Sequence, residues 1–253
     1  MTASIAGLYR HPVKGFTPEP IAEARLEAGR HFPDDRLYAV ENGPSGFDPD
    51  APAHVSKMRF TVLAAIPRVA GIRTRFASDD HSFHAETDGL PPFDGSLKDA
   101  GDRDRLAMWL TDALGDAFSG PLRVVHADGH RFMDHPTKGF VSLLNLASVR
   151  AISERLGRPV DPARFRANIT VDFGAPFIEN DWVGRRVSIG PAELEVLSIT
   201  RRCAATHVNP ETAQTDIDIC QTLFDMTGAP DLGLYCAVTI GGRIVIGDPA
   251  GPA

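Results

Sequence analysis

The chain has 253 residues, of which 43% are hydrophobic and 23% are charged, a composition typical of a globular protein rather than a disordered or fibrous one. This length suffices for one large domain or two small ones, with a substantial core that needs no disulfide staple. The formal charge of −7 argues against nucleic-acid binding, since backbone phosphates repel an acidic surface. Any anionic ligand must therefore be held by a few placed arginines and lysines.

The N-terminal segment has neither a basic region nor a long apolar stretch, so it is not typical of a secretory signal. No window of the sequence reaches transmembrane length. The three cysteines, Cys203, Cys220 and Cys236, form no CxxC pair, which disfavours a structural zinc site or a disulfide framework. We therefore expect a cytoplasmic protein in a reducing environment, without a membrane partner.

Short β-segments separated by turn residues dominate the first half of the chain. Strands are expected at 5–9, 22–26, 36–40, 60–64 and 69–76 because these stretches carry β-formers or alternating apolar residues. Loops are expected at 41–54 and 88–101, where glycine, proline and aspartate gather. The spacing of apolar residues then predicts a helix over 102–114, capped by Asp102.

The second half contains further strands and more helix. Helices are expected at 148–156 and 216–226, followed by Gly157 and Gly228, since glycine commonly ends a helix. Many short strands, few helices and no regular strand–helix alternation predict a β-rich α+β fold, with a curled, barrel-like sheet and peripheral helices. The expected strands are 122–126, 169–172, 186–189, 194–200, 235–240 and 244–246.

Cys203 is the best candidate for chemistry in this chain. It follows Arg201 and Arg202 just beyond an expected strand. Neighbouring guanidinium charge favours thiolate over thiol, and thiolate attacks electrophiles or binds soft metals. Most isolated cysteines are instead small buried hydrophobes. We keep that interpretation for Cys220, in an expected helix, and for Cys236, in an apolar strand.

Basic residues stand at the ends of several expected strands. Lys14 precedes Gly15, which permits a ligand to approach the backbone closely, although a solvated turn lysine is the simpler alternative. Arg36 opens a strand, where an ion pair with its own neighbouring aspartates is the alternative. Arg166 and Asn168 are two residues apart at the entry to a strand, so both can point to one face. A cation and an amide on one face suit a phosphate or a heterocycle.

The histidines do not form a convincing metal set. His81 and His84 are three residues apart, but in polar loop or edge-strand sequence. His126, His130 and His135 follow turns without the periodicity of metal ligands. No GxGxxG or Walker-type loop and no serine nucleophile elbow occurs. The sequence therefore predicts neither a histidine metal centre nor a nucleotide-binding motif.

Nine short motifs, taken together in order and spacing, resemble the MOSC family, named for the C-terminal domain of molybdenum cofactor sulfurases. The likeness extends to stand-alone bacterial MOSC proteins and amidoxime-reducing components. It implies an N-terminal MOSC β-barrel module over 1–120 and a MOSC domain over 121–253. The motifs are YRHPVKG from Tyr9, DR from Asp35, FMDHP from Phe132, SLLN from Ser142, RFRANI from Arg164, DWVG from Asp181, RCAAT from Arg202, GLY from Gly233 and GD from Gly247.

The resemblance implies a molybdenum cofactor, independent of pyridoxal phosphate, with Cys203 as catalytic residue and thiolate ligand of the metal. One cysteine suffices because the dithiolene of the pterin supplies two more sulfurs. The other cofactor contacts that the resemblance implies are Lys14 and Arg36 at the phosphate end, Ser142, Arg166 and Asn168 at the pterin or its phosphate, and Arg202 and Tyr235 near the metal.

Two departures from the family pattern bear on this interpretation. Many relatives carry Pro-Cys-x-Arg-Cys, and the first of those cysteines is Thr200 here. Metal ligation by Cys203 is unaffected, but a second reactive thiol or a persulfide relay is disfavoured. Gly15 also stands where a serine is common, which removes one expected hydrogen bond to the phosphate.

Two functions agree with these residues. The first is a molybdenum oxidoreductase that removes oxygen from N-hydroxylated small molecules. Because the sequence shows no iron–sulfur or flavin module of its own, its electrons would come from separate partner proteins. The alternative is a carrier, in which Cys203 holds molybdenum cofactor or a persulfide for delivery to other enzymes. A barrel-like binding protein with a degenerate site is a third option, which the collected cations and Cys203 disfavour.

Overall fold

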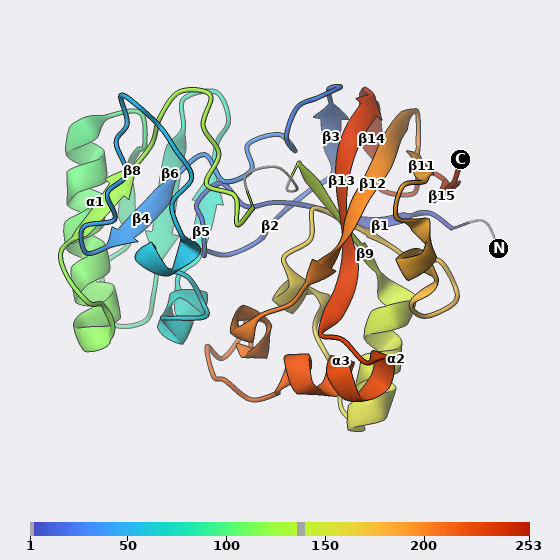
Figure 1. The fold of residues 1–253 in the computed structure, drawn as a ribbon. Coiled ribbons are helices and arrows are strands. Elements are labelled where there is room, and N and C mark those ends of the chain that lie inside the picture. The colour runs from blue at the N-terminus through green and yellow to red at the C-terminus, as the bar shows by residue number, and fades with distance from the viewer. Residues whose placement is uncertain (1–2, 136–139) are drawn as a thin grey trace.

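The structure is a computed structural model that describes residues 3–135 and 140–253. Pro136, the last residue of the FMDHP motif, lies outside the described residues. The fold is β-rich with few helices, as expected (Figure 1). The helices are α1 (Ala100–Leu114), α2 (Leu146–Leu156) and α3 (Ile219–Thr227), with short 3-10 turns η1 (Lys57–Arg59), η2 (Pro67–Gly71), η3 (Gly115–Ala117), η4 (Pro162–Phe165), η5 (Ile178–Trp182) and η6 (Ala204–His207).

An eight-stranded sheet forms the larger body, which holds both chain termini in Figure 1. Its order is β15-β11-β12-β13-β9-β10-β1-β2, and only the β9–β10 pair is parallel. The strands of this sheet are β1 (Ile5–Arg10), β2 (Glu19–Ile21), β9 (Val141–Asn145), β10 (Ile169–Val171), β11 (Arg186–Ile189), β12 (Ala192–Arg201), β13 (Asp231–Ile240) and β15 (Ala250–Pro252).

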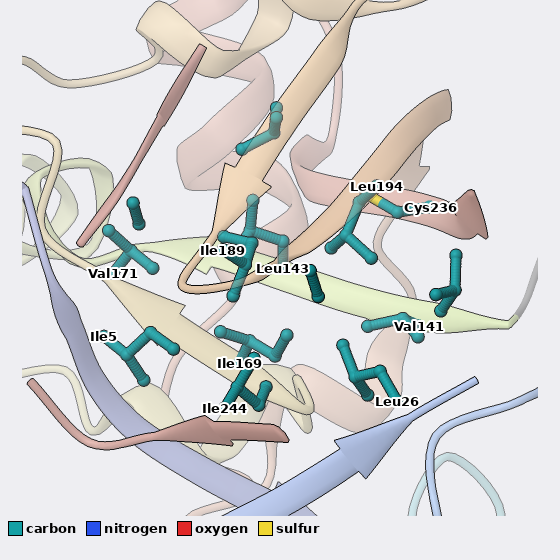
Figure 2. Packing of buried hydrophobic residues seen from close by; sticks show 14 of the residues in the cluster. Ile5, Leu26, Val141, Leu143, Ile169, Val171, Ile189, Leu194, Cys236 and Ile244 are labelled. Carbon is teal, nitrogen blue, oxygen red and sulfur yellow. The ribbon is translucent and has the colours of Figure 1, made fainter. Parts of the chain in front are cut away.

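A two-stranded ribbon of β3 (Glu23–Leu26) and β14 (Gly242–Val245) completes the core of this body. Leu26 and Ile244 from the ribbon belong to the same buried cluster as Val141, Leu143 and Ile169 from the sheet. Figure 2 shows these side chains meeting in one apolar interior. Each fully buried side chain of this size stabilises the fold by roughly 1.5–3 kcal/mol. Closing the ribbon over a curled sheet gives the barrel-like shape expected from the sequence.

The smaller body consists of α1 and two small sheets, at the left of Figure 1. Leu106 and Leu110 of α1 pack against Phe83 and Phe93 in a second buried cluster. The sheets pair β4 (Ala39–Asn42) with β8 (Leu122–Val125), and β6 (Ser82–Glu86) with β5 (Arg73–Phe76) and β7 (Phe93–Ser96).

The larger body contains strands from both ends of the chain, and the smaller body is formed by the segment between them. β1, β2 and β3 come from the first 26 residues but pair with strands of the larger body, whereas β8 returns to pair with β4. The chain therefore passes from the larger body to the smaller one between Leu26 and Ala39, and it returns to the larger body after Val125. The expected division into 1–120 and 121–253 stays a prediction.

Several expected elements of the first half were wrong. Residues 60–64 form no strand beyond one bridge from Phe60 to Glu41, although Phe60 and Val62 are buried. The alternation of apolar residues in this segment reflects their burial. A loop can bury such residues without forming a β-ladder. η2 occupies the start of the expected 69–76 strand, and β7 lies inside the expected loop 88–101.

Three boundaries also need correction. The strand expected at 36–40 begins only at Ala39, because Arg36 has a positive φ of 53°. The cap of α1 is Asp99, whose side chain accepts a hydrogen bond from the N–H of Asp102 (2.9 Å). The expected helix over 216–226 begins at Ile219, after Asp218 caps it.

Candidate functional site

A cleft collects side chains from both halves of the chain. Its walls include all the predicted site residues except Asn168, together with Lys57, Asp134, Thr200 and Arg201, to which the sequence assigned no cofactor contact. Asp134 lies within a recognised motif, so its position was an available signal. Lys57 lies in no motif, and nothing in the sequence marked it. The predicted residues on the walls are Lys14, Arg36, Ser142, Arg166, Arg202, Cys203 and Tyr235.

Cys203 is held at the start of η6 by its own backbone. The N–H and Oγ1 of Thr206 both donate to the carbonyl of Cys203 at 3.0 Å. This fixes Cys203 in an extended conformation directly after β12, with its sulfur half-buried on the cleft wall. Cys220 and Cys236 do not line the cleft. Burial raises the pKa of Cys236 to about 12, so that thiol stays protonated and inert.

Lys57 and Asp134 connect Cys203 to Lys14. The ammonium of Lys57 lies 3.2 Å from the sulfur of Cys203 and 3.2 Å from Asp134 Oδ2. The other carboxylate oxygen of Asp134 accepts from Lys14, whose Nζ also donates to the carbonyl of Phe132 (2.9 Å). Burial alone would lower the pKa of Lys57, but Asp134 and Cys203 raise it above its usual value. Lys57 therefore stays a cation at the sulfur.

Arg36 is anchored by a buried carboxylate. Asp35 pairs with the Arg36 guanidinium and accepts from the backbone N–H of His11 (2.8 Å). Burial favours the protonated acid, but Arg36 and His11 together hold the pKa of Asp35 below its usual range. Burial and the nearby Arg166 lower the pKa of His11 to about 3, so His11 is neutral and Arg36 is the charged partner.

Two further guanidiniums face the cleft without any carboxylate partner among the described residues. Arg166 donates to the carbonyl of Phe16 (2.6 Å), and its Nη2 is buried without a hydrogen bond. Arg202 donates to the carbonyls of Leu232 (2.8 Å) and Phe165 (2.9 Å). Burial and the neighbouring Arg36 lower the pKa of Arg166 to about 9, and burial lowers that of Arg202 to about 10. Both cations would be stabilised by an incoming anion.

Ser142 and Tyr235 face each other across the β9–β13 pair and complete the polar wall. Asn168 is 1% exposed and does not line the cleft. Its Oδ1 accepts from the hydroxyl (2.9 Å) and the N–H (3.0 Å) of Ser142, and its Nδ2 donates to the carbonyl of Tyr9 (3.2 Å). Asn168 thus orients Ser142 from behind the wall.

Gly15 allows the chain to turn directly after Lys14. Its φ is +88°, and a Cβ at this position would lie 2.3 Å from the carbonyl oxygen of Thr61. We expect Gly15→Ala to lower the free energy of unfolding by roughly 1–3 kcal/mol from backbone strain, with the clash adding to it. Urea unfolding measures the loss. Gly129→Ala is the matched control, because Gly129 has φ +72° but no atom within 4 Å; equal losses in the two variants would contradict a close approach at Gly15.

The histidines that the sequence analysis set aside have other contacts. His84 Nδ1 lies 2.8 Å from Asp94 Oδ1, and His81 Nδ1 lies 2.6 Å from the hydroxyl of Tyr38. Across residues 3–135 and 140–253, no group of three or more His, Cys, Asp or Glu side chains is arranged to hold a metal ion. Within the same ranges, no helix has the length and apolar character needed to cross a bilayer.

The cleft thus places one cysteine thiol beside several buried or half-buried cations, a set of side chains suited to an anionic ligand. Comparison with known families identifies the class. Residues 130–250 match the MOSC domain, and residues 2–118 match the MOSC N-terminal beta barrel domain. Together the two matches cover nearly the whole chain, and the protein belongs to the MOSC family.

Curated relatives include a molybdenum cofactor sulfurase of Caenorhabditis elegans, 26% identical over 93% of this chain and 33% of that protein. Another is mitochondrial amidoxime-reducing component 1 of Xenopus laevis, 31% identical over 46% of this chain and 36% of that protein. The chain thus spans about a third of the length of either relative. The YUAD protein from Bacillus subtilis aligns with 99% of this chain and 94% of its own, at 15% identity and a TM-score of 0.47.

Proposed function

We propose that this protein is a molybdenum-cofactor-binding oxidoreductase that reduces N-hydroxylated compounds, with Cys203 as the protein ligand of the metal. The observation that carries the proposal is the cleft itself. It places one accessible thiol on the same walls as Arg166 and Arg202, two half-buried guanidiniums without a carboxylate partner among the described residues. Such a site suits a multiply anionic ligand that also has a soft metal.

The donor set fits the cofactor at both of its ends. The buried, unbonded Nη2 of Arg166 and the unbonded Oγ1 of Thr200 offer hydrogen-bonding capacity on the cleft wall. Lys14, Arg36 and Arg166 would hold the phosphate, and Arg202, Ser142 and Tyr235 would line the pterin. Cys203 would supply the one thiolate that the metal needs from the protein.

When bound, the cofactor supplies the redox chemistry, whereas the protein supplies position and charge. The overall reaction, R–NHOH + 2e⁻ + 2H⁺ → R–NH₂ + H₂O, needs an external donor of electrons, which we propose to be a separate redox protein. Lys57 keeps a positive charge beside the sulfur, since its raised pKa prevents loss of its proton near neutral pH.

The cofactor-loaded protein should reduce benzamidoxime when an artificial reductant such as reduced methyl viologen replaces the natural donor. The product benzamidine is quantified by chromatography, and molybdenum content is measured on the same sample. Protein that contains full molybdenum but gives no benzamidine would contradict the reductase proposal.

The alternative is delivery of cofactor or sulfur to another enzyme. It is favoured by the length of the match to the C. elegans molybdenum cofactor sulfurase, which extends over 93% of this chain. A carrier would transfer molybdenum or labelled sulfur once per molecule to an acceptor enzyme. Stoichiometric transfer without benzamidoxime turnover would therefore support the carrier and reject the reductase.

A further inference from the structure

The cleft wall beside Cys203 carries a guanidinium that the binding of a cofactor phosphate does not require. Arg201 is the last residue of β12, lies two residues before Cys203 and is exposed. Cys203 continues in extended backbone, with φ −138° and ψ 175°. Since alternate residues of extended chain share a face, the two side chains are directed to the same side, and both line the cleft.

No carboxylate of the described residues neutralises Arg201. Its cross-strand neighbour is Asp231, yet no ion pair joins the two, and Asp231 Oδ1 is buried without a hydrogen bond. The two cleft lysines are partly compensated, because the buried Lys14 and the more exposed Lys57 share the single carboxylate of Asp134. Among the described residues, Arg201 is therefore an exposed, unpaired guanidinium on the same cleft wall as the sulfur, whereas the unpaired Arg202 is half-buried and donates to backbone carbonyls.

Lys57 adds a second cation at the same position. Its ammonium contacts the sulfur of Cys203 at 3.2 Å, and its side chain is 29% exposed. Arg201 and Lys57 thus stand on the wall around Cys203, where a small molecule must enter to react. We call these two side chains the cationic rim.

We infer that the cationic rim binds an anionic group, such as a carboxylate, of the small molecule that reacts at Cys203, and that the substrates of this protein are anionic. The statement about substrates rests on the proposed function, whereas the statement about the rim does not. A planar guanidinium pairs with a carboxylate through two parallel hydrogen bonds. A neutral substrate of the same shape leaves Arg201 solvated and gains nothing from it.

The rim can be tested on the full chain without cofactor, through alkylation of Cys203. Iodoacetate and iodoacetamide react identically, since sulfur displaces iodide from a CH₂ group, but only iodoacetate carries a carboxylate. The measured quantity is the rate constant for iodoacetate divided by that for iodoacetamide at Cys203, read by mass spectrometry of the peptide that contains it. This ratio should fall about fivefold in Arg201→Gln, the scale of an exposed ion pair. Added salt should reduce the wild-type ratio in the same direction.

Two controls keep this measurement specific. Arg155→Gln removes the same charge from an exposed arginine in the last turn of α2 and should keep the wild-type ratio. The half-buried Cys220 provides an internal reference within each sample, because it does not line the cleft. Equal ratios at Cys203 in the wild type and in Arg201→Gln would contradict the inference that the cationic rim binds an anionic group.

The substrate class is tested on cofactor-loaded protein with benzamidoxime and 4-carboxybenzamidoxime. The ratio of kcat/KM for the carboxylate over the neutral substrate should fall about fivefold in Arg201→Gln and stay unchanged in Arg155→Gln. Turnover with equal ratios in the wild type and Arg201→Gln would overturn the inference about substrates. If neither substrate turns over, the proposed function fails, and the alkylation ratio still decides whether the rim exists.

Discussion

Replacement of Cys203 by alanine should remove most of the molybdenum that accompanies the purified protein. Of the three cysteines, only Cys203 lines the cleft, so no other thiolate can take its place. Loss of residues that merely support a metal ligand weakens metal binding about 10–100-fold, and loss of the ligand itself should cost at least as much. Elemental analysis per mole of protein after gel filtration measures the effect.

The matched control is Cys220→Ala, which removes a half-buried thiol on α3. This variant should retain wild-type molybdenum. Equal molybdenum in the wild type and Cys203→Ala would refute ligation by Cys203. Pterin fluorescence of denatured samples adds a second readout, because the arginines and lysines of the cleft should still hold part of the pterin in Cys203→Ala. Unchanged thermal unfolding shows that neither substitution disturbs the fold.

The strands of the larger body were predictable because their pattern is local. β11, β12 and β13 alternate buried and exposed residues along most of their length, and period-two alternation is the signature of a half-buried strand. β9 was missed, since Val141, Leu143, Leu144 and Asn145 are all buried and an apolar run without alternation does not distinguish strand from helix. α1 and α2 were predicted within two residues, α1 because its apolar residues recur at helical spacing and α2 because Gly157 ends it.

The site was predictable only in part. Arg201 and Arg202 adjoin Cys203 in sequence, and the ends of expected strands indicated Lys14, Arg36 and Arg166. The family resemblance added Ser142 and Tyr235. The contact between Lys57 and Cys203 joins residues 146 positions apart, so it depends on how the two bodies pack. The position of Asn168 behind Ser142 likewise depends on the β9–β10 pairing. Contacts of this kind follow from tertiary structure and leave no periodic trace in the sequence.

The buried pair of Asp35 and Arg36 leads to the largest expected effect on stability. Asp35 is completely buried, so Asp35→Asn leaves the Arg36 guanidinium without its carboxylate. Breaking a buried ion pair at one partner costs about 3–5 kcal/mol, and we expect a loss of this size in the free energy of unfolding at pH 7. Urea titration followed by circular dichroism measures it. Asp94→Asn is the control. Among the described residues, the exposed carboxylate of Asp94 pairs only with the side chain of His84, so its loss should cost less than about 1 kcal/mol.

The pH dependence of the unfolding free energy shows whether Asp35 stabilises the fold through its charge or through its packing. Because Arg36 and His11 hold the pKa of Asp35 below its usual range, its stabilisation is fully present above the unfolded value near 3.9 and is lost as the pH falls toward the lower folded value. The difference in unfolding free energy between the wild type and Asp35→Asn should therefore be constant from pH 7 to about 4 and shrink below it.

His11 titrates in a different window. Its pKa of about 3 in the folded protein lies below the unfolded value near 6.5, so protonation favours unfolding and stability falls as the pH drops from about 6.5 toward 3. This decline should occur in both the wild type and Asp35→Asn, because burial of the imidazole is its main cause in each. A difference between the two proteins that stays constant down to pH 2 would show that Asp35 acts through packing rather than through its charge.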